Sequence, residues 1–205
     1  MKQPDISKAT LGRIPLYLNY LRGIRPYTEN ISATALAKEL ELGEVQVRKD
    51  LGAVSGAGRP KTGYRVEELI CALKAFLYTE NSEDTVLVGA GKLGRALLDY
   101  NGFLSYGMDI TAAFDQAVQT EERSASGKPI YPMSRFSEFC KNRHVKIGII
   151  TVPASHAQEV CNLMLQNGVR AIWCFAPCIL SVPPNFPVQY ENMALSLAYL
   201  NKKTI

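Results

Sequence analysis

Histidine is scarce in this 205-residue sequence, and no two of its five cysteines form a Cys-x-x-Cys pair. The cysteines lie mostly within apolar segments, at Cys71, Cys140, Cys161, Cys174 and Cys178. A zinc site built from Cys and His ligands is therefore not expected, and we predict no metal centre. Cysteines without such pairing are typical of proteins from a reducing compartment.

The sequence also lacks any run of about 18 apolar residues, the length that a membrane-spanning helix requires. Its first thirty residues show neither the apolar run nor the small-residue cleavage site of a secretory signal. With 47% apolar and 20% charged residues, the composition is that of a folded protein of one or two domains. We therefore expect a cytoplasmic protein without a membrane partner.

The net charge of +4 is concentrated between residues 45 and 65. Against the single acidic residue Asp50, that stretch holds Arg48, Lys49, Arg59, Lys61 and Arg65, so it carries the whole net charge. Neutralising the phosphates of a nucleic acid requires such a local patch. The distribution of charge therefore favours a nucleic-acid-binding protein.

The first 80 residues show apolar side chains at helical spacing and almost no strand signal. Helices are predicted over residues 8–24, 32–40, 44–54 and 67–78, with a glycine-rich stretch from 56 to 63 before the last one. Ser32 can cap the start of the second helix, and Gly43 breaks the chain before the third. Two helices joined by a short turn and followed by a hairpin predict a winged helix-turn-helix domain over residues 1–80.

The basic residues fall on the two parts of such a domain that contact DNA. Gln46, Arg48 and Lys49 lie on its second helix, and Arg59 and Lys61 flank a proline in the predicted wing. Arg and Gln can bind base edges in a major groove, whereas Lys usually contacts phosphates. Arg in a wing can enter a minor groove, where the potential is negative. The alternative is that these residues form only a solvated basic face. Because the basic residues coincide with a helix-turn-helix and a wing, we favour DNA binding.

The pattern changes near residue 82, where short apolar runs begin to alternate with helical segments. Strands are predicted over residues 85–88, 109–114, 146–152 and 169–175, a loop over 116–128, and a last helix over 192–202. Alternation of strand and helix indicates a parallel sheet with helices on both faces. The predicted fold class is α plus α/β, with a Rossmann domain over residues 81–190 and a C-terminal helix over 191–205.

A Gly-x-Gly-x-x-Gly motif at Gly89, Gly91 and Gly94 directly follows an apolar strand and opens a helix. In that context the glycines allow a tight turn, the approach of a pyrophosphate, and close packing of helix against strand. The pyrophosphate would lie on the free amides at the helix N-terminus. Asp115 ends the second strand, where a carboxylate can accept a ribose hydroxyl and repel a 2′-phosphate, so NAD is favoured over NADP. The alternative is a Rossmann-like domain of another kind, such as one that binds CoA.

The sequence offers little for catalysis. A nicotinamide-dependent dehydrogenase needs a general acid or base near the reacting carbonyl, and His156 is the only histidine near the strand ends that form the crevice. The DNA-binding apparatus also leaves little chain for a substrate domain. We therefore predict no catalytic residue and no enzyme, with an NAD-dependent oxidoreductase as the alternative. Trp173 is expected near the crevice, where its fluorescence would report NADH but not CoA.

Along nearly its whole length the chain resembles the redox-sensing transcriptional repressors of the Rex family. The resemblance rests on the order and spacing of several segments: ISKATLGRIPLYLNYL, VQVRKDL, GRPKTGY, VLVGAGKLGRALLDYNGF, AAFD and TVPASHAQ. It implies a homodimer that binds an inverted-repeat operator in double-stranded DNA when NADH is low and leaves it when NADH binds. It also implies that the C-terminal helix is exchanged between the two subunits.

The resemblance further implies a role for individual residues. The cofactor, NADH or NAD, would contact Gly89, Ala90, Gly91, Lys92, Leu93, Gly94, Asp115, Thr151 and Pro153, and DNA would contact Arg48, Lys49, Arg59 and Lys61. Tyr100 matches a family tyrosine that changes partners between the two states and contacts a carboxylate at the start of the exchanged helix. Here that position is Asn192, which carries no charge, so the sequence departs from the family in the ionic link to Arg13.

Overall fold

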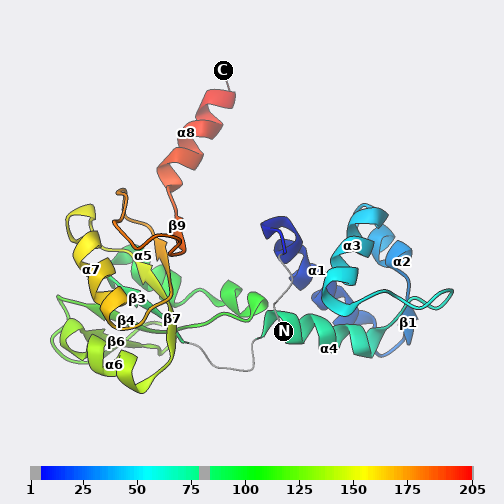
Figure 1. Cartoon of the computed structure of the whole chain (residues 1–205), viewed down its shortest axis with the longest axis horizontal. Helices are drawn as coiled ribbons and strands as arrows, with labels where there is room; N and C mark the ends of the chain where they lie inside the picture. The colour runs from blue at the N-terminus through cyan, green and yellow to red at the C-terminus, as the bar shows by residue number, and fades with distance from the viewer. Residues whose placement is uncertain (1–5, 79–83, 205) are drawn as a thin grey trace. The chain divides into compact units, whose positions relative to one another are not determined.

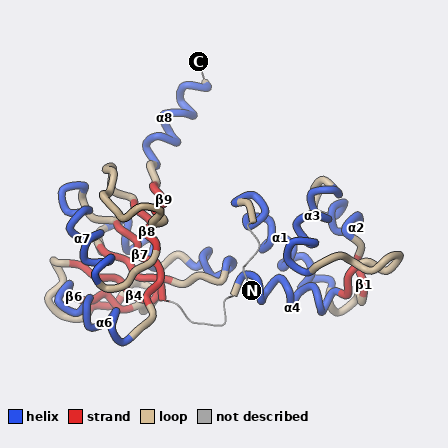
Figure 2. The backbone as a smooth tube through the Cα atoms, in the orientation of Figure 1, coloured by secondary structure: helices blue, strands red, loops and turns tan. Residues whose placement is uncertain are grey.

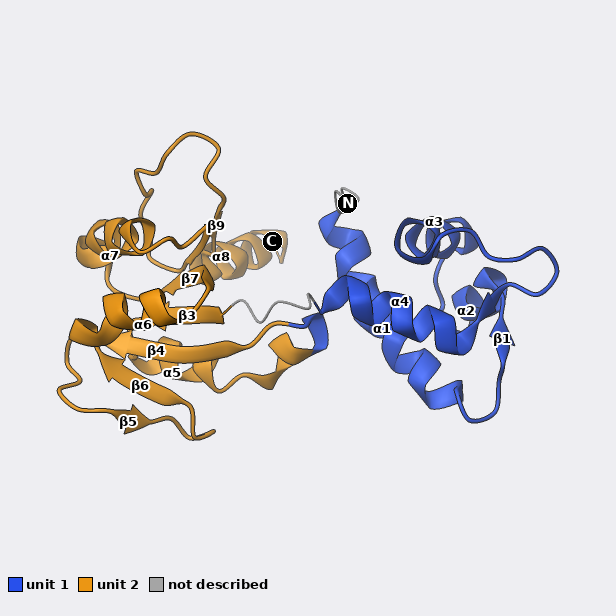
Figure 3. Cartoon of the chain, turned by 60° about the horizontal axis from the view of Figure 1, so that its bottom comes forward, with its two compact units in different colours: residues 1–80, 105–107 blue, residues 81–104, 108–205 orange. Residues whose placement is uncertain are grey.

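The computed structural model describes residues 6–78 and 84–204, and the chain divides into two compact units. Residues 1–80 with 105–107 form unit 1, and residues 81–104 with 108–205 form unit 2 (Figure 3). Unit 1 is mainly helical and unit 2 is α/β, which confirms the predicted fold class. No helix within the described residues is both long enough and apolar enough to cross a bilayer.

Unit 1 is a small helical bundle with a two-stranded ribbon. Its elements are α1 (Lys8–Ile24), β1 (Asn30–Ile31), α2 (Ala33–Glu39), α3 (Glu44–Ser55), β2 (Tyr64–Arg65) and α4 (Val66–Leu77) (Figure 1). The hydroxyl of Ser32 accepts a hydrogen bond from the amide of Ala35 at 3.0 Å, so it caps α2 as predicted. A turn at Gly43 joins α2 to α3, and β1 pairs with β2 in antiparallel register.

The core of unit 1 holds α3 against α1 and α4. Side chains that recur at helical spacing are buried together, among them Ile14, Leu21, Leu36, Leu51 and Leu73. The opposite face of α3 remains exposed to solvent. The burial pattern therefore fixes which side of α3 is presented outward.

A buried carboxylate also ties α3 to α1. Asp50 on α3 is only 2% exposed, and Arg13 holds it through Nε at 2.6 Å and Nη2 at 3.0 Å. The hydroxyl of Tyr17 donates to the same carboxylate at 2.7 Å, and the amide of Gln46 at 2.9 Å. Burial by itself would raise the pKa of Asp50, but these hydrogen bonds outweigh it and hold the pKa below its ordinary value. Asp50 is therefore ionised and fully engaged.

Unit 2 is built on a seven-stranded sheet (Figure 2). Its strands are β3 (Asp84–Val88), β4 (Ile110–Asp115), β5 (Glu122–Arg123), β6 (Pro129–Pro132), β7 (Val145–Ile150), β8 (Ala171–Cys174) and β9 (Val188–Tyr190). They lie in the order β5-β6-β4-β3-β7-β8-β9, and only the β5–β6 pair is antiparallel. The chain order reverses between β3 and β7, so the sheet has its topological switch point there, where open α/β sheets bind ligands.

Helices cover both faces of this sheet. They are α5 (Lys92–Leu98), α6 (Phe136–Asn142) and α7 (Ala154–Gln166), with 3₁₀ turns at η1 (Asn101–Tyr106) and η2 (Met133–Arg135). A further helix, α8 (Met193–Lys203), follows the last strand and does not cover the sheet. One face of the sheet packs on α6 and α7 through residues such as Phe136 and Met164, and the other packs on α5 through Leu98. The α8 helix buries none of its side chains.

Three strands in unit 2 differ from the sequence prediction. The stretch 116–128, expected to be a loop, contains the short strand β5, and the strands β6 and β9 were not predicted. All three lie toward the edges of the sheet. The two edge strands are only two and three residues long, and β6, which lies between β5 and β4, begins and ends with proline, a residue that argues against a strand in a sequence. Their sequences therefore carry a weak strand signal.

We expect Asp50→Asn to destabilise unit 1 by about 3 kcal/mol, because the substitution leaves the largely buried Arg13 without its countercharge. The matched control is Glu67→Gln, which breaks the exposed pair with Arg25 and should change stability by less than about 1 kcal/mol. Urea denaturation followed by circular dichroism measures both. Equal stability losses in the two variants would contradict the structural role of Asp50.

The ion pair between Arg13 and Asp50 also makes the stability of unit 1 depend on pH. The pKa of Asp50 is lower in the folded than in the unfolded state, so its contribution is fully present above the unfolded value and is lost as pH falls through the folded value. The stability gap between the parent and Asp50→Asn should therefore narrow below about pH 4. A gap that stays constant from pH 7 to pH 3 would contradict this assignment.

Candidate functional site

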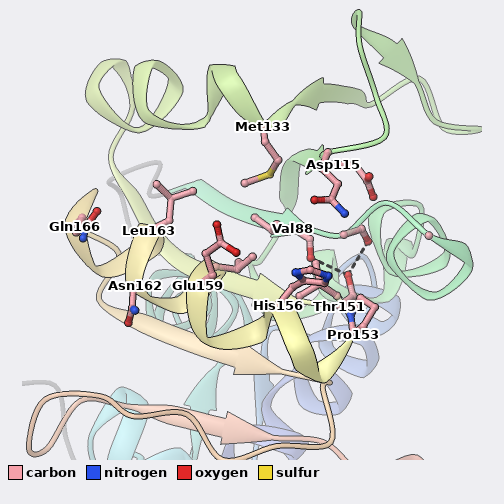
Figure 4. A pocket seen from close by; sticks show the side chains of 15 residues that line it. Val88, Asp115, Met133, Thr151, Pro153, His156, Glu159, Asn162, Leu163 and Gln166 are labelled. Atoms are coloured by element: carbon pink, nitrogen blue, oxygen red, sulfur yellow. Dashed lines mark hydrogen bonds between the residues drawn. The ribbon is translucent and has the colours of Figure 1, made fainter.

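A cavity of about 600 Å³ opens at the carboxyl ends of β3, β4 and β7 (Figure 4). It lies at the switch point of the sheet, between the turn after β3 and the helix α7. Its walls come mainly from the turn after β3, the turn after β7 and one face of α7. The lining residues are Val88, Gly89, Gly91, Asp115, Gln116, Met133, Thr151, Val152, Pro153, His156, Glu159, Val160, Asn162, Leu163 and Gln166.

The turn after β3 is packed so tightly that two of its glycines are required. Gly89 has φ +106°, and a Cβ there would lie 2.8 Å from the carbonyl carbon of Thr151. A Cβ on Gly94 would lie 1.9 Å from the carbonyl oxygen of Gly89. The hydroxyl of Thr151 donates to the carbonyls of Val88 at 3.1 Å and Gly89 at 2.7 Å, which joins the two turns. The edge of the cavity is therefore rigidly defined.

Gly91 differs from these two glycines because it has open space beside it. It is the N-cap residue of α5 and lines the cavity, and a Cβ built on it meets no atom within 4 Å. No side chain caps the first turn of α5, so its free amides can donate to an anion that approaches across Gly91. The residues at this turn fit a pyrophosphate.

Asp115 lies at the end of β4 and points into the cavity (Figure 4). Its Oδ2 accepts from the amide of Ala90 at 2.6 Å, and its Oδ1 accepts from the amide of Ala117 at 2.8 Å. These bonds fix the carboxylate beside the glycine turn. A carboxylate has about four acceptor sites, so two remain for hydroxyl groups of a ligand.

The cavity brings together five of the nine predicted cofactor residues, namely Gly89, Gly91, Asp115, Thr151 and Pro153. Ala90, Lys92, Leu93 and Gly94 belong to the same turn and helix but do not line the cavity. Sequence reasoning missed the wall formed by α7, including Glu159 and Leu163. Its lining positions recur every three or four residues, so the helical period of that segment was the available signal.

Trp173 is not where the sequence predicted it. It does not line the cavity; it packs on the α5 face of the sheet, 4.6 Å from Phe175 and 5.9 Å from Phe103 between ring centroids. Its Nε1 donates to Glu191 at 3.3 Å. Side chains alternate along a strand, and the neighbours Ile172 and Cys174 occupy the α6 and α7 face, which leaves Trp173 on the other.

Two residues expected to take part in a switch have local roles in this structure. Asn192 is the N-cap of α8, and its side-chain oxygen accepts from the amide of Leu195 at 3.0 Å. Asn is as good a cap as Asp, so the departure from the family pattern leaves the start of the helix capped. Tyr100 is 57% exposed and packs edge-on against Phe103 at 5.0 Å.

The exposed face of α3 and the wing carry the predicted DNA-binding residues. Arg48 pairs with Glu44 one turn earlier, and Arg59 lies 3.9 Å from Glu68. Within the described parts of the chain, Lys49 and Lys61 have no ion-pair partner. Pairs between exposed groups are weak, so all four cations are available to phosphates.

The wing is held as a closed loop. The amide and carbonyl of Arg59 both bind Gly63, at 2.7 and 2.9 Å, and Lys61 at the tip has φ +68°. A Cβ on Gly63 would lie 2.3 Å from the carbonyl oxygen of Ile31, so the base of the loop packs against β1. The loop therefore projects its basic side chains from a fixed base. No group of three or more potential metal ligands occurs among the residues described.

Comparisons with known proteins agree with both halves of this description. Residues 5–52 match the family model described as putative DNA-binding protein N-terminus, and residues 80–178 match the one described as CoA binding domain. A redox-sensing transcriptional repressor Rex from Treponema denticola is 36% identical over 97% of this chain and 95% of its own length. One from Brevibacillus brevis is 34% identical over 97% of each chain.

Solved structures give the same result. The crystal structure of RSP in complex with NAD⁺ and operator DNA matches with a TM-score of 0.79 and 27% identity, over 97% of this chain and 92% of that one. The complex of RSP with NADH matches with a TM-score of 0.69 and 26% identity, over 98% and 94%. RSP is described as a Rex-family repressor.

The two glycines of the turn should respond differently to the same added methyl group. Gly94→Ala should destabilise unit 2 by about 1–3 kcal/mol or more, because the added Cβ would overlap the carbonyl oxygen of Gly89. Gly91→Ala places a methyl group in open space and should change stability by less than about 1 kcal/mol. Urea denaturation compares the two, and equal losses of stability would contradict the description of this turn.

Proposed function

The chain belongs to the Rex family of redox-sensing transcriptional repressors, and we propose that it binds operator DNA as a homodimer and is released from it by NADH. The observation that carries the proposal is that one chain contains both an open glycine turn at the switch point of a Rossmann sheet and a winged helix-turn-helix in which Lys49 of α3 and Lys61 of the wing have no ion-pair partner among the described residues. An operator-binding protein works where the chromosome is, so we place it in the cytoplasm.

The cofactor would be NADH or NAD, held at the cavity. The pyrophosphate would cross Gly91 and accept hydrogen bonds from the first turn of α5 at Lys92 and Leu93. Asp115 would accept a ribose hydroxyl while its bonds to the amides of Ala90 and Ala117 keep it in place. Pro153 begins the α7 wall, and Thr151 keeps the two turns together. The cofactor would supply the redox signal.

We propose that α3 enters the major groove with Gln46, Arg48 and Lys49, and that the wing carries Arg59 and Lys61 toward the minor groove. Arg48 and Arg59 exchange weak surface pairs for phosphates or bases on binding. A homodimer would place two such helices on an inverted repeat.

The C-terminal helix α8 supports the dimer. Its large apolar side chains Met193, Leu195, Leu197, Tyr199 and Leu200 are all more than half exposed within the single chain. An apolar helix that buries nothing in its own chain is suited to a partner surface. We propose, as the family resemblance implies, that this helix is exchanged between subunits.

We propose that Tyr100, Asn192 and Arg13 take part in the switch. Arg13 is already bound to the buried Asp50, so any second partner must compete with that pair. Asn192 offers only a hydrogen bond, and its oxygen already caps α8. Coupling through these residues is therefore expected to rely on Tyr100, which is 57% exposed and whose hydroxyl has no hydrogen bond to another described residue that a new partner would have to break.

A regulator fits better than an enzyme. His156 lines the cavity and is the residue that an NAD-dependent oxidoreductase would use as its acid or base. No substrate domain accompanies it within the described residues, whereas a complete winged helix does. The relatives that span the whole chain are repressors, which also distinguishes this reading from a CoA-binding module.

Selection of operators from randomised double-stranded DNA tests the proposal. We expect an inverted repeat to be enriched by the full-length chain without NADH, and the enrichment to fall when NADH is present but to persist with NAD. Failure to enrich any sequence, or enrichment that NADH leaves unchanged, would contradict it.

Lys49→Ala should weaken binding to the selected operator and lower the slope of log Kd against log salt by about one, because one phosphate contact is lost. The control is Lys141→Ala, which removes a lysine from α6 in unit 2. Binding at several salt concentrations measures both, and an unchanged slope in Lys49→Ala would remove that residue from the interface.

Asp115 should set the choice between the two nicotinamide cofactors. Asp115→Asn removes the charge that repels a 2′-phosphate but keeps an oxygen for one of the loop amides, so the preference for NADH over NADPH should fall about tenfold or more. Asp99→Asn changes a carboxylate that binds Ser126 outside the cavity and should leave the preference unchanged. Titration of each variant with both cofactors decides, and an unchanged preference in Asp115→Asn contradicts the assignment.

A further inference from the structure

Gln46 is a base-contacting candidate whose side chain is attached to the buried carboxylate of unit 1. Its Nε2 donates to Oδ1 of Asp50 at 2.9 Å, one helical turn along α3. The two side chains differ in exposure, since Asp50 is 2% exposed while Gln46 lies on the exposed face of α3. The amide of Gln46 therefore joins the interior of the unit to its outer surface.

The bond to Asp50 has only one possible direction. An ionised carboxylate accepts hydrogen bonds and cannot donate, so Gln46 must present its NH₂ group and not its carbonyl oxygen. Arg13 and Tyr17 hold the carboxylate in its ionised form from the other side. Contact with Oδ1 thus excludes the flipped amide, which would set two acceptors against each other.

This orientation leaves a defined pair of groups for a ligand. One N–H of the Gln46 amide binds Asp50, and its carbonyl oxygen and second N–H have no bond to another described residue. An amide that offers one acceptor and one donor side by side matches adenine, which presents the N6 amino group and the N7 acceptor in the major groove. Guanine offers two acceptors there and does not match this pair.

We propose that Asp50 is a positioning residue that orients the amide of Gln46, so that α3 recognises an adenine of the operator through Gln46. The inference rests on the proposed DNA-binding function. The alternative explanation is that the bond between Gln46 and Asp50 is an ordinary i,i+4 contact that only stabilises the helix. The two differ in what they predict for base recognition, because a helix-stabilising contact has no effect at a single base position.

The test uses the full-length chain and a selected operator in which each adenine is replaced in turn. Purine lacks the N6 amino group, and 7-deazaadenine lacks the N7 acceptor. We expect one adenine position per half-site at which either analogue weakens binding about tenfold. Gln46→Ala should lose this sensitivity at that position and keep the sensitivity at all others.

The role of Asp50 is tested with two variants of the same network. Asp50→Asn, whose amide can face Gln46 with either a donor or an acceptor, should reduce the sensitivity to both analogues to less than about threefold. Tyr17→Phe removes a bond to the other carboxylate oxygen, so it perturbs the network without touching the bond to Gln46. It should keep the full tenfold sensitivity.

Three outcomes decide between the possibilities. Gln46→Ala with unchanged sensitivity at every adenine overturns the inference. If Asp50→Asn keeps the full sensitivity to both analogues, only the role of Asp50 is overturned. If Tyr17→Phe loses as much sensitivity as Asp50→Asn, Asp50 only stabilises the unit in general and does not position Gln46. If no operator is selected by the parent chain, the proposed function itself fails, so the two failures are distinguishable.

Nuclear magnetic resonance of the parent chain decides the matter if Asp50→Asn does not fold. The side-chain amide protons of Gln46 should exchange with water more slowly than those of Gln119, which is exposed and has no bond to a described residue. Equal exchange rates for Gln46 and Gln119 would show that Asp50 does not hold the amide and would overturn the inference.

Discussion

The buried negative charge of Asp50 is the interaction on which the DNA-facing half of the molecule depends. A carboxylate that is removed from water must be compensated by hydrogen bonds and an opposite charge, and here Arg13 and Tyr17 of α1 provide them. As a result α3 cannot rotate or slide against α1 without leaving a charge unpaired. The same requirement determines which way Gln46 turns its amide. The buried carboxylate thereby determines which hydrogen-bonding groups the exposed side chain of Gln46 presents.

The crevice of unit 2 depends on close packing in a comparable way. Gly89 and Gly94 have no room for a side chain, and Thr151 ties the carbonyls of the first turn to the second. Gly91 has room but carries no side chain, so the space beside it remains open to a ligand. Asp115 closes the arrangement by accepting the amide of Ala90. Contacts within the chain alone hold these groups in place, and a surface that is ordered in this way costs less to order when a ligand binds.

Much of this was predictable because the relevant signals are local. A glycine motif between an apolar strand and a helix locates the crevice, and Ser32 marks the start of α2 from its residue type alone. The strands β6 and β9 were missed because they lack a clear apolar alternation. The buried network was missed because Arg13 and Asp50 lie 37 positions apart. In the sequence Asp50 is only one opposing charge in a basic stretch, and only the fold shows what it binds.

We propose that the two units are coupled, so that NADH and operator DNA favour different states of the same molecule. Linkage then requires each ligand to weaken the other by the same factor. The most direct measurement is the Kd of NADH for the free chain and for the chain saturated with operator, beside the Kd of the operator with and without NADH. We expect the same ratio in both titrations, well above one. An affinity for NADH that is equal in the free and DNA-bound chain would contradict it.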